Sequence, residues 1–123
     1  GNADYSESSV AYRPTWLPDG YTEFHTSETE SITAVLYQNE EGLILTFQYT
    51  HNQNKTDWFI DAEHAVIKET TVNGCPAEVI LTDNITTASV ITWADEQDSA
   101  FYVSGFLSES DLIKIAENVQ PMK

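Results

Sequence analysis

Apolar and polar residues alternate along two stretches of the chain, residues 43–50 and residues 75–82. A period of two is typical of a β-strand, because successive side chains point to opposite faces of the sheet. The more apolar positions are Leu43, Leu45, Phe47 and Tyr49 in the first stretch, and Cys75, Ala77, Val79 and Leu81 in the second. Each stretch is therefore predicted to be a strand with one wetter face.

Turn sequences join these strands to neighbouring apolar segments. Three pairs of segments are predicted to form hairpins: residues 32–38 with 43–50, 65–72 with 75–82, and 89–94 with 100–106. Gly42 can take the positive φ that the first loop needs, and Asn73-Gly74 is the strongest short hairpin signal. The third loop, residues 95–98, is polar and short enough to reverse the chain. A further strand is expected after residues 16–21.

The end of the chain changes to a helical period. The apolar residues there recur every three or four positions: Leu112, Ile115, Ala116 and Val119. Ser108 is a natural N-cap, and Pro121 marks the stop. A helix this short is marginal alone, so its apolar stripe must dock on the sheet. The patterns predict an α+β fold, an antiparallel sheet of six or seven strands built from hairpins, with the helix of residues 108–120 packed on one face.

Length and composition place the sheet and the helix in a single domain. The chain has 123 residues, of which 41% are hydrophobic, and this is enough for one core but not for two. Residues 1–12 are polar and show no period, which predicts a flexible tail or tether. Residues 13–123 are predicted to form the domain. Because the sequence starts at Gly1 rather than at a Met, we expect a leader, a membrane anchor or another domain upstream.

The chain is strongly acidic, with 20 Asp and Glu against 5 Lys and Arg and a formal net charge of -15. Such a charge repels nucleic acid phosphates and anionic membrane surfaces, so no nucleic acid partner is expected. No apolar run reaches the roughly 18 residues that cross a bilayer, so no transmembrane segment is predicted. The acidity indicates either attraction to a basic partner or to cations, or a solvated surface, and the second interpretation is favoured.

Motifs of known enzymes and metal sites are absent from the sequence, including Gly-rich phosphate loops, His-Glu-x-x-His, paired cysteines and the Gly-x-Ser-x-Gly elbow. We therefore expect no enzymatic activity, no catalytic residues, no cofactor and no bound metal. Asp57, Asp61 and His64 would share a face if their segment were helical, but a solvated acidic loop is the favoured interpretation. The residues interpreted as ordinary strand or loop positions are His25, His51 and Cys75.

The candidate binding residues are two neighbouring aromatics, Trp58 and Phe59, in an otherwise polar crossover. Large aromatics in such a segment can line a ligand cleft or anchor a protein interface. The alternative, which is favoured, is that they pin their own loop to the core. Trp16 is likewise expected to pack against the sheet.

Several segments carry a resemblance to a known family. Residues 16–21 (WLPDGY), 34–37 (AVLY) and 41–47 (EGLILTF) resemble the opening of the C-terminal domain of RseB/MucB periplasmic regulators. Residues 103–107 (VSGFL) and 113–119 (IKIAENV) are similar to that family's last strand and helix. The N-terminal lipoprotein-binding-like domain of that family has no counterpart in the residues of this sequence, so we do not expect lipid sensing from the resemblance.

The sequence resembles even more closely a bacterial family of extracytoplasmic domains of unknown function, found in lipoproteins and anti-sigma-factor-like proteins. The shared elements are residues 16–21, 72–74 (VNG), 91–93 (ITW) and the entry to the helix. The resemblance covers about residues 13–120, and its motifs are mainly structural. It implies an extracytoplasmic location, at the cell surface or in the periplasm, with a membrane anchor upstream.

Three functions remain open from the sequence. The leading hypothesis is a non-enzymatic module that binds a protein or cell-envelope ligand and modulates signalling. A small hydrolase or carbohydrate-active accessory domain with acidic cleft residues is the first alternative. A structural spacer domain is the second.

Overall fold

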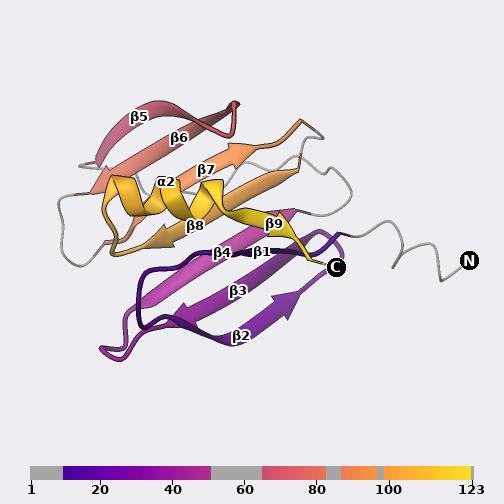
Figure 1. Ribbon diagram of the computed structural model, residues 1–123, viewed down its shortest axis with the longest axis vertical. Coiled ribbons are helices and arrows are strands. Elements are labelled where there is room, and N and C mark those ends of the chain that lie inside the picture. The colour runs from indigo at the N-terminus through magenta and orange to yellow at the C-terminus, as the bar shows by residue number, and fades with distance from the viewer. Residues whose placement is uncertain (1–9, 51–64, 83–86, 97–98, 123) are drawn as a thin grey trace, which may run out of the picture.

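A seven-stranded antiparallel sheet forms the centre of the computed structural model (Figure 1), which describes residues 10–50, 65–82, 87–96 and 99–122. The strands follow the order β2-β3-β4-β8-β7-β6-β5 across the sheet. Their bounds are β2 (Thr22–Glu28), β3 (Ile32–Gln38), β4 (Ile44–Thr50), β5 (Ala65–Val72), β6 (Cys75–Thr82), β7 (Ser89–Ala94) and β8 (Ala100–Gly105). The predicted fold class is confirmed, and so are the three predicted hairpins.

The sheet consists of two meanders. Strands β2, β3 and β4 form one, strands β5 to β8 form the other, and β4 pairs with β8 in the middle. Phe47 of β4 lies directly opposite Val103 of β8, and Ile91 of β7 lies opposite Val103 on its other side. These three side chains are fully buried. The central pairing therefore carries one continuous apolar row across both meanders.

The turn between β5 and β6 has the geometry that its sequence predicts. Asn73 has a φ of 50° and Gly74 a φ of 86°. Two consecutive positive φ values are typical of a type I′ turn, whose twist matches that of the strands it joins. The turn sets the register of the hairpin, which runs from Val72 opposite Cys75 to Ala65 opposite Thr82.

Helix α2 (Glu109–Glu117) covers one face of the sheet, over the half formed by β5 to β8 (Figure 1). As predicted, Ser108 caps the helix, its side chain accepting a hydrogen bond from the backbone N–H of Asp111. The helix residues that are fully buried against the sheet are Leu112, Ile115 and Ala116. We call this side of the sheet the helix face and the opposite side the far face.

Contacts at its two ends align α2 with strand β5. The Lys68 ammonium donates to Glu109 at 2.8 Å, and the Asn73 side chain donates to the Glu117 carbonyl at 3.2 Å. The second contact satisfies one of the carbonyls that a helix C-terminus leaves without a partner.

The predicted end of the helix, near Gln120, is wrong. The helix stops at Glu117, and Val119 begins a short strand, β9 (Val119–Pro121), which pairs with β1 (Tyr12–Pro14). The apolar period continues to Val119 because this residue also packs against the core, but from a strand. The backbone there is bound by partners more than a hundred residues away, a long-range pairing that overrides local helical preference.

Strand β1 lies on the helix face together with β9 (Figure 1). It begins at Tyr12, one residue before the domain start expected at Arg13. The ring of Tyr12 makes edge-to-face contacts with Tyr49 and Phe101, with centroids 5.3 and 5.0 Å apart. Such aromatic pairs add to the stabilisation that burial gives. Tyr12 is therefore part of the folded core.

No helix among the described residues is long and apolar enough to cross a membrane.

Two isoleucine substitutions test the packing of α2. Ile115 is fully buried under the helix, whereas Ile67 on β5 is 54% exposed. Ile115→Ala should lower the free energy of unfolding by about 2–5 kcal/mol, because it leaves a cavity in the core. Ile67→Ala, the matched control, should cost less than about 1 kcal/mol. Denaturant unfolding measures both, and equal losses would contradict this account of the core.

Candidate functional site

The candidate binding residues Trp58 and Phe59 lie outside the residues that the structure describes, in the segment 51–64. The same is true of His51 and of the residues considered as metal ligands, Asp57, Asp61 and His64. Their roles stay predictions. The remaining candidates for a functional site lie on the surfaces of the described strands.

The structure does describe three other residues that the sequence singled out: Trp16, His25 and Cys75. Trp16 packs against the core, as expected, and the Lys114 ammonium lies 4.3 Å from the centre of its ring. His25 is exposed on the outer strand β2, next to an irregularity in its pairing with β3. Cys75 is a partly buried free thiol at the start of β6. None of the three belongs to a metal-binding cluster within the described ranges of the chain.

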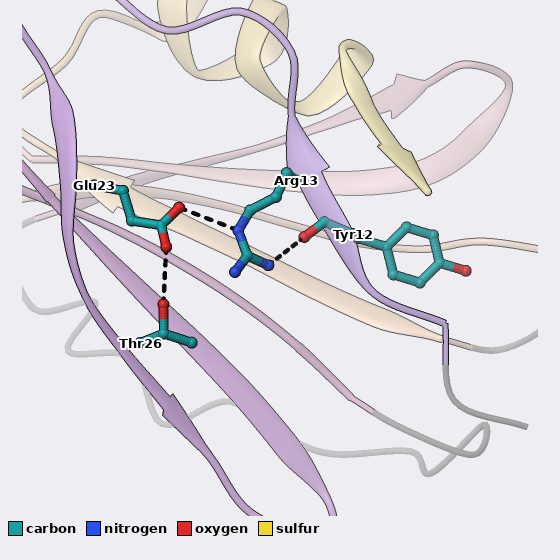
Figure 2. A network of polar contacts seen from close by, with 4 residues as sticks. All are labelled: Tyr12, Arg13, Glu23 and Thr26. Atoms are coloured by element: carbon teal, nitrogen blue, oxygen red, sulfur yellow. Dashed lines mark hydrogen bonds and ion pairs between the residues drawn. The ribbon is translucent and has the colours of Figure 1, made fainter. Parts of the chain in front are cut away.

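A small polar network joins β1 to β2 (Figure 2). The Arg13 Nε donates to Glu23 at 3.3 Å, and its Nη1 donates to the Tyr12 carbonyl at 2.9 Å. Thr26 donates to the other Glu23 oxygen at 3.0 Å. Partly exposed ion pairs of this kind contribute at most about 1 kcal/mol. The network fastens β1 to an outer strand and offers no open site.

Tyr37 lies beneath this network and is 4% exposed. Burial is the main cause that raises the pKa of its phenol, the charge of Glu23 adds to the rise, and the charge of Arg13 opposes it; the resulting pKa is about 12. The phenol is therefore neutral over the physiological range, as is usual for a buried core tyrosine.

A shallow hollow of about 440 Å³ lies over strands β5 to β8. The residues that line it are Glu69, Thr70, Pro76, Ala77, Glu78, Thr92, Trp93, Ala94 and Ala100. Glu69, Glu78 and Thr92 form one row across the sheet. They alternate with residues of the helix face, so their side chains belong to the far face. The hollow is therefore on the side of the sheet opposite α2.

Small side chains create the hollow. Ala94 and Ala100 lie directly opposite each other on β7 and β8, in the row of residues beyond Thr92. An alanine pair leaves the surface low, whereas the neighbouring row carries the longer side chains of Glu69 and Glu78. The two carboxylates therefore stand at one side of a depression whose floor is the sheet itself.

Glu69 and Glu78 face each other directly across the β5–β6 pair. Directly opposed side chains have Cβ atoms about 4.5–5.5 Å apart, and like charges there are destabilising. In a chain with a net charge of -15 this is an added local repulsion. The arrangement is suited to a positively charged group, which would relieve the repulsion.

No metal-binding cluster accompanies this pair in the part of the chain that the structure describes, since no three His, Cys, Asp or Glu side chains gather there. Two exposed carboxylates on an open surface are a poor cage for a cation. They are better placed to meet the side chain of a Lys or an Arg.

The outer strand β5 borders the hollow and exposes two large aliphatic side chains. Val66 is 60% exposed and Ile67 is 54% exposed. Ile67 and Glu69 flank one another on the far face, because they are two residues apart on one strand. Val66 lies opposite Leu81 and belongs to the helix face. We therefore call Ile67, Glu69 and Glu78 together the β5 surface. It combines apolar area with negative charge and is the best candidate binding site of the described structure.

The sequence contained a signal for the acidic pair. Once Asn73-Gly74 is accepted as a two-residue turn, Glu69 and Glu78 must lie opposite each other, because each is four positions from it. The exposed aliphatic residues carried no such signal, because β5 could equally have been an inner strand.

Comparison with known proteins gives one match. A family model described as "Domain of unknown function (DUF4367)" matches residues 11–119. No curated protein and no solved structure matches the chain. The matched range begins one residue before β1 and ends at the first residue of β9, so it spans the described fold.

The repulsion within the acidic pair can be measured through stability. Glu78→Gln should raise the free energy of unfolding by up to about 1 kcal/mol at low salt, because it removes a like charge opposite Glu69. Glu40→Gln, in the exposed β3–β4 loop, changes the net charge equally and is the control. The difference in unfolding free energy between Glu78→Gln and Glu40→Gln should become smaller at higher salt, because salt screens the charges. Equal effects of the two substitutions would contradict a specific repulsion.

The raised pKa of the Tyr37 phenol predicts that the free energy of unfolding falls at alkaline pH. Because its pKa in the folded protein is about 12, above the roughly 10 of an unfolded chain, its contribution is complete below about pH 10 and declines as the pH rises towards 12. Tyr37→Phe has no ionisable hydroxyl at this position, so the part of the alkaline loss of stability that is due to Tyr37 disappears. The difference in unfolding free energy between variant and parent should therefore shift in favour of the variant from about pH 8 to about pH 11. A constant difference would show that Tyr37 titrates normally.

Proposed function

This chain belongs to the DUF4367 family, and we propose that its domain is a non-enzymatic protein-binding module of a membrane-anchored regulator or lipoprotein, acting outside the cytoplasm. The observation that carries this proposal is the β5 surface, where exposed Ile67 borders the carboxylates of Glu69 and Glu78. Interfaces combine apolar anchors with charges that select the partner and guide its approach.

The location outside the cytoplasm draws on the resemblance to RseB-type regulators and to anti-sigma-factor-like proteins. Residues of the motifs that carry this resemblance pack within the fold. Trp16 packs on the core, and a Cβ at Gly105 would lie only 3.1 Å from the Leu107 side chain. These residues support a shared architecture, whereas the choice of partner falls to the surface residues.

An enzymatic alternative would use the same two carboxylates. Glycoside hydrolases act through paired Asp or Glu residues, one of which is kept protonated by apolar surroundings. Glu69 and Glu78 are both exposed and stand on an open sheet surface, where such surroundings are missing. This favours binding over hydrolysis. The remaining alternative, a spacer domain, does not account for an exposed isoleucine beside a repulsive pair of carboxylates.

The proposal is tested with the full-length protein in its own cells. A membrane-impermeant maleimide should label Glu40→Cys, made in a Cys75→Ser background, in intact cells. A photo-reactive residue in place of Ile67 should form an adduct with one defined protein, while the same residue in place of Glu40 should not. Labelling only after lysis would overturn the location. Failure to obtain a protein adduct specific to position 67 would overturn the binding function.

A further inference from the structure

Along the outer edge of β5, backbone groups that have no strand partner among the described residues recur in a regular pattern. The type I′ turn closes on a hydrogen bond between Val72 and Cys75, and hydrogen-bonded pairs alternate along an antiparallel ladder. Ile67, Glu69 and Thr71 therefore direct their N–H and C=O groups away from β6. No other described strand pairs with this edge.

The two outer strands of the sheet differ in how they are protected. Strand β2 is irregular between Glu23 and His25, and such a bulge discourages the pairing of another strand. Strand β5 keeps its register with β6 over eight residue pairs. Its one lysine, Lys68, is paired with Glu109 of α2 at 2.8 Å, so it is drawn toward the helix face. Within the described part of the chain, the edge of β5 is thus regular and without a strand partner, whereas that of β2 is interrupted.

Two rows of side chains cross the far face and end at this edge. One row is apolar and runs through Ile67, Ile80 and Val90; the inner two are buried, and Ile67 is 54% exposed. The next row runs through Glu69, Glu78 and Thr92 along the hollow. An added strand would place one side chain opposite Ile67 and another, two residues away, opposite Glu69. The first position favours an aliphatic residue and the second favours a Lys or an Arg.

We propose that β5 binds an extended segment of a partner protein as an additional strand, with an aliphatic residue beside Ile67 and a basic residue beside Glu69 and Glu78. This inference rests on the proposed binding function and names its partner chemistry. Main-chain hydrogen bonds would hold the segment, and the two side-chain rows would select its sequence.

A second copy of this chain is a poorer occupant of the same edge. Each copy carries a net charge of -15, and pairing β5 with β5 would add two more carboxylates to the repulsive row. Charge complementarity therefore selects a basic partner segment over self-association.

A peptide selection tests the inference directly. The folded chain is panned against a library of random decapeptides in buffer of moderate ionic strength. We expect enrichment of peptides with a Lys or Arg two positions from a Val, Ile or Leu. Their binding should protect the amides of Ile67, Glu69 and Thr71 from hydrogen exchange. Absence of enrichment, or enrichment without basic residues, would overturn the proposal.

Variants and modified peptides separate the two components of binding. Glu69→Gln should weaken an enriched peptide about fivefold or more, and Glu40→Gln should have no comparable effect. Thr71→Pro, which removes an outward N–H from an outer strand, should abolish binding. Methylation of alternate peptide nitrogens makes the same test without altering the protein. Binding that is indifferent to methylation would overturn strand addition.

Two further outcomes distinguish a failure of this inference from a failure of the proposed binding function. A position-specific adduct at Ile67 in cells, combined with no effect of methylation or of Glu69→Gln, would leave the binding function standing and refute the strand mode. A concentration-dependent dimer in sedimentation experiments that Thr71→Pro disrupts would show that a second copy occupies the edge, which refutes the basic partner.

Discussion

The pairing of β4 with β8 is the contact on which the rest of this fold depends. Each meander can form from local turns, but each contributes only part of the apolar surface that makes up the core. The register that sets Phe47 against Val103 joins the two apolar faces into one surface. Only then is there a continuous platform for α2 on one half and for the β1–β9 ribbon on the other. Phe47 and Val103 are more than fifty residues apart, so this pairing has a loop-closure cost that the short turns within each meander do not have.

What could be predicted from the sequence follows this division between local and long-range contacts. The hairpins were predictable because a two-residue turn such as Asn73-Gly74 has few backbone solutions. The capped start of α2 was predictable for the same reason, since Ser108 acts on the adjacent turn. The order of the two meanders has no comparable signal, and neither does the end of the helix. Val119 leaves the helical path for a partner, Pro14, at the other end of the chain.

The candidate site shows the same limits. The acidic pair follows from the hairpin turn alone, whereas the hollow needs β7 and β8 beside it, with Ala94 facing Ala100. The exposure of Ile67 depends on which strand ends the sheet. The sequence drew attention to Trp58 and Phe59 instead, because aromatic residues in a polar segment stand out by composition. A surface assembled from several strands is visible only after the strand order is known.

The β1–β9 ribbon has a mechanical consequence. Tyr12 lies opposite Pro121, and the Met122 N–H donates to the Ala11 carbonyl at 2.7 Å, so the chain enters and leaves the fold at the same end of the ribbon. Tension applied between the two chain ends would open the hydrogen bonds of this ribbon one after another, as in a zipper, rather than loading them together in shear. Tyr12 would then be pulled from its aromatic contacts early. The domain should therefore unfold at low force when it is pulled by its two chain ends. It should unfold at higher force when it is pulled by one chain end and a point on β5.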